Sequence, residues 1–294
     1  MSESKSRSRP DSDARIALVT DSTCDLPAKV QDLYDPTVVP LHVTLGGVEY
    51  VDGVDMDNAT YYQRFREAGQ MATSSQPSVG EFVTVYESLL KRYDAVASVH
   101  ASARLSGTME SATLAAQKIG ADRVRVVDSR HVSVGVGLVI QAAGEAIRAG
   151  KSLQEVAQIT ETAAKNTRVY GALFDLEVAV RGGRISEPAA RVAELVKLKP
   201  IIVFSEDGAA RVGGAAMGFT RALAAMAGKA ERFAQGKPCR AAIVHVQSLE
   251  SAQFVQKRLA SSLDTGDIPL VEAGAAITTH VGLGTVAVSV QRLQ

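Results

Sequence analysis

The chain has 294 residues, of which 46% are hydrophobic and 22% are charged. These values are ordinary for a protein that buries a core, and they exclude fibrous, collagen-like and wholly disordered chains. Thirty-two basic and thirty-two acidic side chains cancel to a net charge of zero, so no overall field attracts nucleic acid or an anionic membrane. At roughly 100 to 200 residues per domain, the length predicts two domains.

Neither a metal centre nor a disulfide framework is predicted. Cys24 and Cys239 lie far apart and have no companions at metal-ligand spacing, and the five histidines do not pair at such intervals. We therefore expect no cofactor and a cytoplasmic setting. The polar residues 1–14 contain no apolar run and are expected to form a disordered tail rather than a secretion signal. Residues 273–291 lack acidic and basic side chains but contain glycines and hydroxyl groups, so we expect a buried strand plus a loop and no stable membrane insertion.

From Arg15 onward, short β-branched runs alternate with longer amphipathic segments, which is the pattern of an α/β protein. Ser78 with Glu81, and Ser152 with Glu155, form capping-box patterns that predict two helix starts. The predicted strands of the first half are Ile16–Thr20, Thr37–Val43, Ala95–His100 and Val124–Val127.

The segment Val132–Ala149 is predicted to be a helix that ends at Gly150. It is apolar nearly all round and contains several glycines, so it should be buried on most sides. Two interpretations stay open for it: a core helix packed closely against a sheet, or one wall of a tunnel for a ligand.

The strand pattern restarts near residue 166, where we predict a boundary between two lobes. Residues 15–165 would form an N-terminal α/β lobe and residues 166–294 a C-terminal α/β lobe. No repeat or low-complexity linker marks this boundary, so a broad interface between the lobes is expected. The predicted strands of the second half are Val169–Phe174, Ile201–Phe204, Ala241–Val246 and Val286–Val290.

Three common enzyme signatures fail in this sequence. The segment Gly282–Ala287 resembles a dinucleotide fingerprint, but only seven residues follow it, too few for the next helix and strand. The glycine spacing of residues 213–220 resembles a phosphate loop, but Phe219 stands where a lysine must reach the phosphates. A Gly-x-Ser-x-Gly elbow is absent from the sequence. NAD binding, nucleotide hydrolysis and elbow-type hydrolysis are therefore disfavoured.

Three hydroxyl-rich segments, expected to be loops, stand out at Thr20–Thr23, Thr73–Ser75 and Ser102–Thr108. Two of them directly follow predicted strands, and in open α/β sheets the carboxyl ends of the strands face the binding crevice. Ser106 also precedes a predicted helix, whose free N–H groups favour an anion. A helix-capping role is the alternative for each hydroxyl, although Ser78 already caps the helix that follows the second segment.

Three further features allow two interpretations each. Asp128 fits either a turn or the wall of a site. The glycines between Arg181 and Arg184 predict a sharp bend, which either closes a turn or presents the arginines to an anion or a partner. His280, before a glycine-rich turn, is either a satisfied core histidine or a donor to the same ligand as the hydroxyl groups.

A set of short motifs follows one order along nearly the whole chain after the tail. The motifs are Val19–Pro27, Val39–Leu41 with Tyr50–Gly53, Ser74–Ser78, Leu105–Thr108, Val127–Ser129, Gly182–Ile185, Lys199–Pro200 and His280–Gly282. Each motif alone is weak, but together and in this order they resemble the motifs of the DegV family.

This resemblance implies a two-lobed α/β fold with mostly parallel sheets flanked by helices, and a ligand between and within the lobes. It implies that the protein binds one long-chain fatty acid, with the acyl chain buried and the carboxylate held by hydroxyl groups. It also implies that the protein is not itself an enzyme. Some members, called FakB, present the acid to a separate fatty acid kinase, which makes an acyl phosphate for phospholipid metabolism.

The resemblance also assigns residues. Ser106 matches the family's carboxylate-binding serine, and Ser74 stands where relatives usually have threonine. His280 is similar to the histidine that supports the head group, and Thr73 is a neighbour of Ser74. We therefore expect Ser74, Ser106, His280 and Thr73 to bind the fatty acid, with uncharged donors rather than a lysine or arginine holding the carboxylate.

The sequence departs from the family pattern at positions that bear on the partner. Met217 stands where kinase-partnered relatives carry a basic residue implicated in docking, and Leu283 stands where a proline is usual. These differences weaken the expected kinase partnership more than the expected fatty-acid binding. Two alternatives stay open: a lipid carrier that serves a different partner, and an acyl hydrolase with Ser106 as nucleophile and a histidine such as His280 as base.

Overall fold

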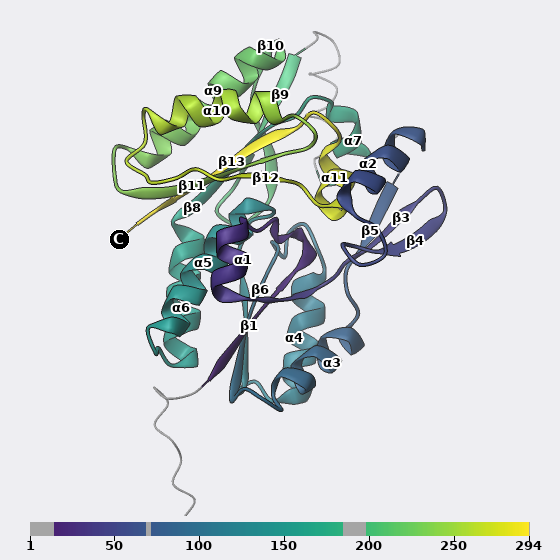
Figure 1. Ribbon diagram of the computed structural model, residues 1–294, viewed down its shortest axis with the longest axis vertical. Coiled ribbons are helices and arrows are strands. Elements are labelled where there is room, and N and C mark those ends of the chain that lie inside the picture. Colours follow the sequence, from purple (N-terminus) through teal and green to yellow (C-terminus); the bar gives the residue numbers. More distant parts are fainter. Residues whose placement is uncertain (1–14, 69–71, 185–197, 294) are drawn as a thin grey trace, which may run out of the picture.

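The computed structural model describes residues 15–68, 72–184 and 198–293. The tail predicted for residues 1–14, and Ile185 of the Gly-Gly-Arg motif, lie outside the described residues. Figure 1 shows two α/β lobes, each built on its own sheet, with a small third sheet at one side of their junction. The predicted α/β class and the two-lobed arrangement are confirmed.

The N-terminal lobe is built on a four-stranded sheet in the order β2-β1-β6-β7, and each neighbouring pair is parallel. Its strands are β1 (Ile16–Asp21), β2 (Thr37–Val39), β6 (Ala95–His100) and β7 (Val124–Asp128). Every residue of β1 and β6 is buried. Continuous burial of this kind requires helices on both faces of a parallel sheet.

Helices cover both faces of this sheet. They are α1 (Ala28–Tyr34), α3 (Val79–Leu89), α4 (Thr108–Ile119), α5 (Val134–Arg148) and α6 (Leu153–Lys165). The face that carries Ala17 and Val19 packs against α3 and α4, and the face that carries Ile16 and Leu18 packs against α5 and α6. Both predicted capping boxes are present, and α5 confirms the long apolar helix.

A three-stranded antiparallel sheet, in the order β4-β3-β5, lies beside the junction together with helix α2. Its elements are β3 (His42–Leu45), β4 (Val48–Val51), β5 (Ala72–Ser75) and α2 (Asn58–Glu67). The single strand predicted over Thr37–Val43 is wrong, because Pro40 has no backbone N–H to continue a ladder and separates β2 from β3. The expected loop at Thr73–Ser75 is also wrong, since these residues belong to β5.

The C-terminal lobe is built on a six-stranded sheet in the order β10-β9-β8-β13-β11-β12. Its strands are β8 (Thr167–Ala172), β9 (Leu198–Phe204), β10 (Ala210–Met217), β11 (Cys239–His245), β12 (Leu270–Glu272) and β13 (Val286–Arg292). In the described part of the sheet, β11 and β12 are parallel and the other neighbouring pairs are antiparallel.

The expectation of mostly parallel sheets is therefore correct for the first sheet and wrong for the second. A tight turn with Gly208 at a φ of 84° joins β9 directly to β10, so these strands form a hairpin. In addition, β13 enters between β8 and β11 and runs against both. Of the two glycines that resembled a phosphate loop, Gly213 lies in β10 and Gly218 directly follows this strand.

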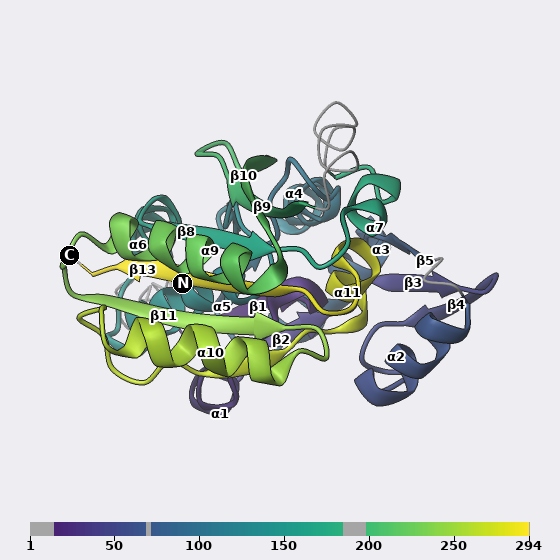
Figure 2. The same cartoon turned by 90° about the horizontal axis from the view of Figure 1, so that it is seen from above.

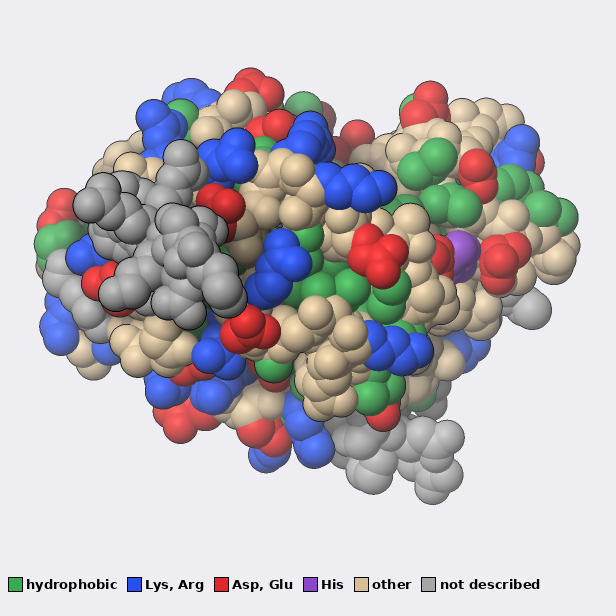
Figure 3. Space-filling view, turned by 90° about the horizontal axis from the view of Figure 1, so that it is seen from below, with side chains coloured by type: hydrophobic (Ala, Val, Ile, Leu, Met, Phe, Trp, Pro, Cys, Tyr) green, Lys and Arg blue, Asp and Glu red, His purple; other side chains and the backbone are tan. Residues whose placement is uncertain are grey.

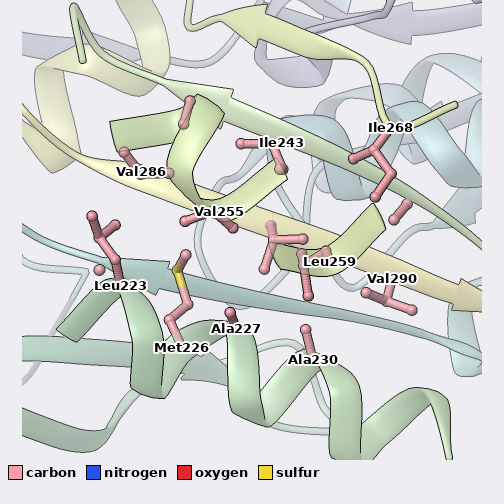
Figure 4. Close-up of a cluster of buried hydrophobic side chains, with 14 of the residues drawn as sticks. Leu223, Met226, Ala227, Ala230, Ile243, Val255, Leu259, Ile268, Val286 and Val290 are labelled. Carbon is pink, nitrogen blue, oxygen red and sulfur yellow. The ribbon is translucent and has the colours of Figure 1, made fainter. Parts of the chain in front are cut away.

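Helices α9 (Phe219–Ala234) and α10 (Leu249–Ala260) cover one face of the six-stranded sheet. Figure 4 shows Met226 and Ala227 of α9 in the same buried cluster as Val255 of α10 and Val286 of β13. The other face of the sheet is turned toward the N-terminal lobe (Figure 1). The space between this face and the loops of the N-terminal lobe is where the candidate site lies.

Two short helices, α7 (Leu176–Arg181) and α11 (Ala275–Val281), lie at the same side of the junction as the small sheet (Figures 1 and 2). The strand plus loop expected over residues 273–291 is wrong in its first part, which is α11, and correct for β13. The sequence pattern misses α11 because a distant carboxylate supports its start: Asp25 accepts a hydrogen bond from the Gly274 N–H at 2.8 Å.

Polar contacts join the two lobes. Arg240 of β11 donates two hydrogen bonds to the carboxylate of Glu145 on α5, at 2.9 and 3.0 Å. Helix α6 ends and β8 begins on either side of residue 166, where the lobe boundary stays a prediction.

Figure 3 shows acidic and basic side chains interspersed on one face, in keeping with a net charge of zero. None of the described helices has the length and apolar character needed to cross a membrane.

Candidate functional site

A largely apolar cavity lies between the lobes, at the carboxyl ends of β1 and β6. The face of β8, β9, β11 and β13 forms one wall, helices α7 and α11 form another, and the loops after β1 and β6 close the rest. The space between the walls, open mouth included, is about 1030 Å³, and the cavity volume within it is about 130 Å³. The difference between the two volumes means that the cavity is narrow, which suits a thin chain.

Small residues make room for this cavity. Gly171 of β8, Ala276 of α11 and Ala287 of β13 line it, where larger side chains would fill it. A Cβ atom placed on Gly171 would lie 3.6 Å from the Cβ of Ala287, an ordinary contact. Packing between strands therefore does not require glycine at position 171, and its effect is to leave space in the cavity.

Helix α5 resolves the two interpretations of the apolar segment. Val136, Val139 and Ile140 are buried in the core of the N-terminal lobe. Val132 and Ser133, at the start of the segment, line the cavity. The segment is thus mainly a core helix, and its first residues contribute to the wall of the site.

Ser74 and His280 form a hydrogen-bonded pair at the wall of the cavity. The Ser74 Oγ lies 2.7 Å from the Nε2 of His280. Burial lowers the pKa of His280 to about 4, and the charge of Arg184 adds to this effect, so the imidazole is neutral at pH 7. The Nδ1 of His280 is buried without a hydrogen-bond partner among the described residues.

The unpaired Nδ1 of His280 indicates which ring nitrogen carries the proton of the neutral imidazole. A buried N–H without a partner costs more than a buried acceptor without one. We therefore place the proton on Nε2, which donates to the Ser74 Oγ. Ser74 then keeps its own hydroxyl proton free for a ligand in the cavity.

Ser106 lines the same cavity and also supports a helix start. Its Oγ lies 2.8 Å from the Oγ1 of Thr108 and accepts a hydrogen bond from the Thr108 N–H at 3.2 Å. Ser106 therefore lines the cavity and accepts from the first N–H of α4, although the N-cap residue of this helix is Gly107, which has no side-chain cap. The structure brings Ser74, Ser106 and His280 to one cavity, as the resemblance implied.

Thr73 is not part of this cavity. Successive residues of a strand point to opposite faces, so Thr73 of β5 points away from the side that Ser74 occupies. Thr73 is exposed and lines a separate groove, whose wall also includes Ala72 and His280. Its role in binding a fatty acid stays a prediction.

Arg184 is a cavity residue that the sequence analysis did not select as a ligand. Its guanidinium donates to the backbone oxygens of Leu105 at 3.3 Å and of Gly182 at 2.7 Å. Burial lowers the pKa of Arg184, but a guanidinium stays protonated at neutral pH. The cavity wall therefore includes one charged side chain, and the expectation that uncharged donors hold the carboxylate stays a prediction. The Gly-Gly-Arg bend was the available signal, because it leaves the arginine free to turn toward the loop that carries Ser106.

Two hydroxyl groups in the cavity wall donate to buried carboxylates behind it. Thr23 donates to Asp21 at 2.5 Å, and Ser133 donates to Asp25. Burial raises the pKa of Asp25 to about 7, although its hydrogen bonds to Ser133 and Gly274 act in the opposite direction. Since both hydroxyl protons are directed away from the cavity, this part of the wall offers little to a charged head group.

A second buried network lies inside the N-terminal lobe. Ser98 lies 2.7 Å from the Nε2 of His100, whose Nδ1 lies 3.0 Å from Asp21. Burial raises the pKa of Asp21, but the hydrogen bond and charge of His100 and further hydrogen bonds outweigh it, so the net shift is downward. The sequence of contacts from serine to histidine to aspartate resembles that of a catalytic triad. All three are completely buried, Ser98 also contacts Tyr86, and none lines the cavity, so the network is structural.

The hydrolase alternative receives little support from this geometry. His280 is paired with Ser74 rather than with Ser106, and its Nδ1 has no carboxylate to orient the ring as in a triad.

Asp128 accepts from the Arg130 N–H at 2.7 Å and does not line the cavity, which favours its turn interpretation. No group of three or more potential metal ligands occurs in the described residues.

Comparisons with known proteins place the chain in a family. Residues 15–293 match the family model described as uncharacterised protein, DegV family. A DegV domain-containing protein of Deinococcus radiodurans is 34% identical over 279 residues, which cover 95% of this chain and 99% of that protein.

Solved structures are similar over the same extent. A DegV family protein from Thermus thermophilus, described as binding fatty acid, is 36% identical with a TM-score of 0.88, covering 95% of this chain and 100% of that one. DegV of Bacillus subtilis, described as a fatty acid binding protein, is 29% identical with a TM-score of 0.84 and the same coverage. From the family model and the extent of these similarities, the chain belongs to the DegV family.

Proposed function

We propose that this protein binds one long-chain fatty acid, with the acyl chain in the apolar cavity and the carboxylate beside Ser74, Ser106 and His280. The observation that carries the proposal is the cavity itself, narrow and mostly apolar, with both serines on its wall. The DegV proteins of Thermus thermophilus and Bacillus subtilis, which are described as binding fatty acid, support it by similarity.

Burial of the acyl chain would dominate the affinity. About fifteen methylene groups at roughly 0.8 kcal/mol each give on the order of 12 kcal/mol before the costs of binding. A hydroxyl hydrogen bond contributes only about 1 kcal/mol. The head-group residues therefore fix the position of the carboxylate more than they determine how tightly the lipid binds.

The arrangement of donors suits a carboxylate. With the Nε2 of His280 donating to Ser74, the Ser74 hydroxyl would donate to one carboxylate oxygen, while Ser106 is available to the head group from the loop between β6 and α4. Arg184 adds a positive charge close by and offsets part of the cost of removing the carboxylate from water.

The protein would act as a carrier in the cytoplasm, with the covalent step on a separate fatty acid kinase. In that step a carboxylate oxygen forms a bond to the terminal phosphorus of a nucleoside triphosphate, and the nucleoside diphosphate leaves. Met217, at the end of β10, is exposed and uncharged, so it does not supply the basic docking contact of kinase-partnered relatives. A carrier that serves a different partner is therefore the second candidate.

Lipid extraction tests the proposal directly. The purified protein is denatured and extracted, and the extract is analysed by mass spectrometry against a protein-free control. We expect a fatty acid in roughly equimolar amount with the protein. An empty extract, together with no binding of added palmitate in a titration, would refute the proposal.

A further inference from the structure

A buried carboxyl group that the proposed function does not use lies directly behind the wall of the cavity. Asp25 follows the short 3-10 helix η2 (Ser22–Cys24) and does not itself line the cavity. Its Oδ2 accepts a hydrogen bond from the hydroxyl group of Ser133, and Ser133 does line the cavity. One hydroxyl group thus separates this carboxyl from the space proposed for the acyl chain.

The same carboxyl group supports a second part of the wall. Its Oδ1 accepts a hydrogen bond from the Gly274 N–H at 2.8 Å, where helix α11 starts. Ala276 and Ile277 of this helix line the cavity. Asp25 is therefore connected to the cavity wall through both Ser133 and α11.

No basic group compensates the negative charge of an ionised Asp25. Among the described residues, no lysine, arginine or histidine nitrogen lies within 4.0 Å of its carboxylate. His100 is bonded to Asp21 instead, and Lys29 of α1 is exposed and bonded to Asp267. An ionised Asp25 would be stabilised by hydrogen bonds alone.

The other ionisable groups on the elements around Asp25 are neutral or acidic. They are Cys24 of η2, Asp52 after β4, Tyr62 of α2, Glu272 at the end of β12 and His280 at the far end of α11, while those of α5 lie in its last turn. Burial raises the pKa values of Cys24 and Tyr62, so both are uncharged at pH 7. The charge of Asp52 disfavours the ionised form of Asp25.

Filling the cavity would favour the neutral form of Asp25 for two reasons. Methylene groups replace water beside Ser133, and loss of water disfavours a charged group. The ligand also brings its own carboxylate into the same enclosed space, and like charges disfavour each other. Burial already raises the pKa of Asp25 to about 7, so a further rise changes its charge near neutral pH.

We propose that loading of the cavity is coupled to the uptake of a proton by the Asp25 carboxyl. This inference rests on the proposed fatty-acid binding. The proton comes from the solvent, to which 9% of the surface of Asp25 stays exposed. By linkage, the protein with neutral Asp25 binds the ligand more tightly than the protein with ionised Asp25, so the affinity falls as pH rises above neutrality.

Isothermal titration in two buffers measures the proton directly. Palmitate is added to the delipidated protein at pH 7.5 in phosphate and in Tris, whose heats of ionisation differ. A rise in the pKa of Asp25 from about 7 to about 8 on loading corresponds to uptake of roughly half a proton per ligand at this pH. The same rise predicts that the palmitate affinity falls about eightfold between pH 6 and pH 9.

Asp25→Asn keeps an acceptor for the Gly274 N–H but cannot ionise. Its binding enthalpy should be the same in both buffers, and its palmitate affinity should not change between pH 6 and pH 9. Asp128→Asn is the matched control, because burial also raises the pKa of Asp128 but this side chain does not line the cavity. It should take up as much proton as the wild type. Undiminished uptake in Asp25→Asn would overturn the inference.

Two further variants keep the test decisive if Asp25→Asn does not fold. Ser133→Ala removes a hydrogen bond that favours ionised Asp25, so the pH at which the affinity begins to fall should move upward. Asp52→Asn removes a like charge, so this pH should move downward. Altered packing alone does not predict shifts in opposite directions. An unmoved pH profile in both variants would contradict the inference.

The remaining outcomes distinguish this inference from the proposed function. If the wild type binds palmitate with equal enthalpies in the two buffers, proton uptake is refuted and fatty-acid binding is left intact. If the wild type does not bind palmitate at all, the proposed function itself is refuted.

Discussion

The imidazole ring of His280 is held in place from two sides. One ring nitrogen is paired with Ser74, and the other lies against the backbone of Gly182, where a Cβ atom would come within 2.8 Å of Nδ1. The glycine at position 182 is thus needed for close approach rather than for its φ of −66°. This contact fixes the ring from the side opposite to Ser74, which keeps the serine in one orientation.

The two serines differ in what their removal should cost. Ser106 both lines the cavity and accepts from the first N–H of α4, whereas Ser74 bonds only to a side chain. Ser106→Ala should lower the free energy of unfolding by about 1 kcal/mol, and Ser74→Ala should lower it by about 1 to 3 kcal/mol, because it leaves the Nε2–H of His280 without a partner. Each variant should weaken palmitate binding by about fivefold, the equivalent of one hydroxyl hydrogen bond.

Urea denaturation of the lipid-free protein and titration with palmitate separate the two effects. Thr84→Ala, which removes an exposed hydroxyl within α3, is a control for loss of a hydroxyl outside the site. Unchanged palmitate affinity in the Ser74→Ala, Ser106→Ala double variant would show that neither hydroxyl contacts the ligand.

At the scale of single residues, the sequence selected three residues that line the cavity and did not select a fourth, Arg184. Ser74, Ser106 and His280 could be selected because each lies in a short motif whose order along the chain is specific. Arg184 could not be assigned, since its place depends on the bend after α7 bringing it to the Leu105 carbonyl, 79 residues away in sequence. Thr73 was grouped with Ser74 because the segment was read as a loop; in a strand, the two adjacent residues face opposite sides.

Strand β8 separates the hydrophobic core of the C-terminal lobe from the apolar cavity. Tyr170 and Ala172 face the α9 side, and Val169 and Gly171 face the cavity. The absence of a side chain at position 171 therefore bears on the capacity of the cavity rather than on the core.

Enlarging position 171 should reduce the length of chain that fits. Gly171→Ala should be tolerated, because its Cβ meets Ala287 at an ordinary distance, but Gly171→Leu should weaken palmitate binding by about tenfold or more. Each methylene group kept out of the cavity costs roughly 0.8 kcal/mol. Affinities for a series of fatty acids measure the effect, and shorter acids should be affected less. Equal palmitate affinity in the Leu variant and the wild type would mean that the chain does not pass β8.

Helix α11 shows how a distant residue supports an element that the local sequence does not predict. It has seven residues, and its start is held by the Asp25 carboxylate, which also accepts from Ser133. By contrast, β1 and β6 were predictable because burial on both faces demands continuous apolar runs. The β9–β10 hairpin was missed because the glycines in β10 weaken its strand pattern.

The pKa of Asp25 predicts a pH dependence of stability. Burial raises this pKa from 3.8 to about 7 in the folded protein. Between these values the folded state binds a proton that the unfolded chain releases, so the free energy of unfolding should fall as pH rises from about 4 to about 7. The full rise in the pKa of Asp25 corresponds to a change in the free energy of unfolding on the order of 4 kcal/mol.

The variant Asp25→Asn isolates this contribution. His131 and His280, whose pKa values burial lowers to about 4, act in the opposite direction, because their neutral forms favour the folded state as pH rises. Both histidines are present in the variant, so their effects cancel in the difference between the two proteins. Urea denaturation at several pH values should show the variant gaining stability relative to the wild type up to about pH 7. A difference that does not change with pH would mean that Asp25 is ionised in the folded protein throughout.

At the scale of the whole molecule, the cavity belongs to neither lobe alone. Loops of the N-terminal lobe contribute Thr23 and Ser106, and the C-terminal sheet contributes Ile202 and Val244. The ion pair between Arg240 and Glu145 and the hydrogen bond from Ser102 to the Gly208 oxygen join the two lobes. A chain of methylene groups in this space would add apolar contacts to both lobes at once.

Binding should therefore stabilise the two lobes as one unit. Calorimetry of the delipidated protein with and without palmitate should show one transition that moves upward as a whole. At a free palmitate concentration of one hundred times Kd, the stabilisation is about 2.7 kcal/mol, which corresponds to roughly 5 °C or more in Tm. Two separate unfolding transitions, with only one Tm raised by palmitate, would mean that the ligand contacts a single lobe. Such a result would contradict a cavity shared between the lobes, because a ligand bound only to folded walls stabilises every part that forms them.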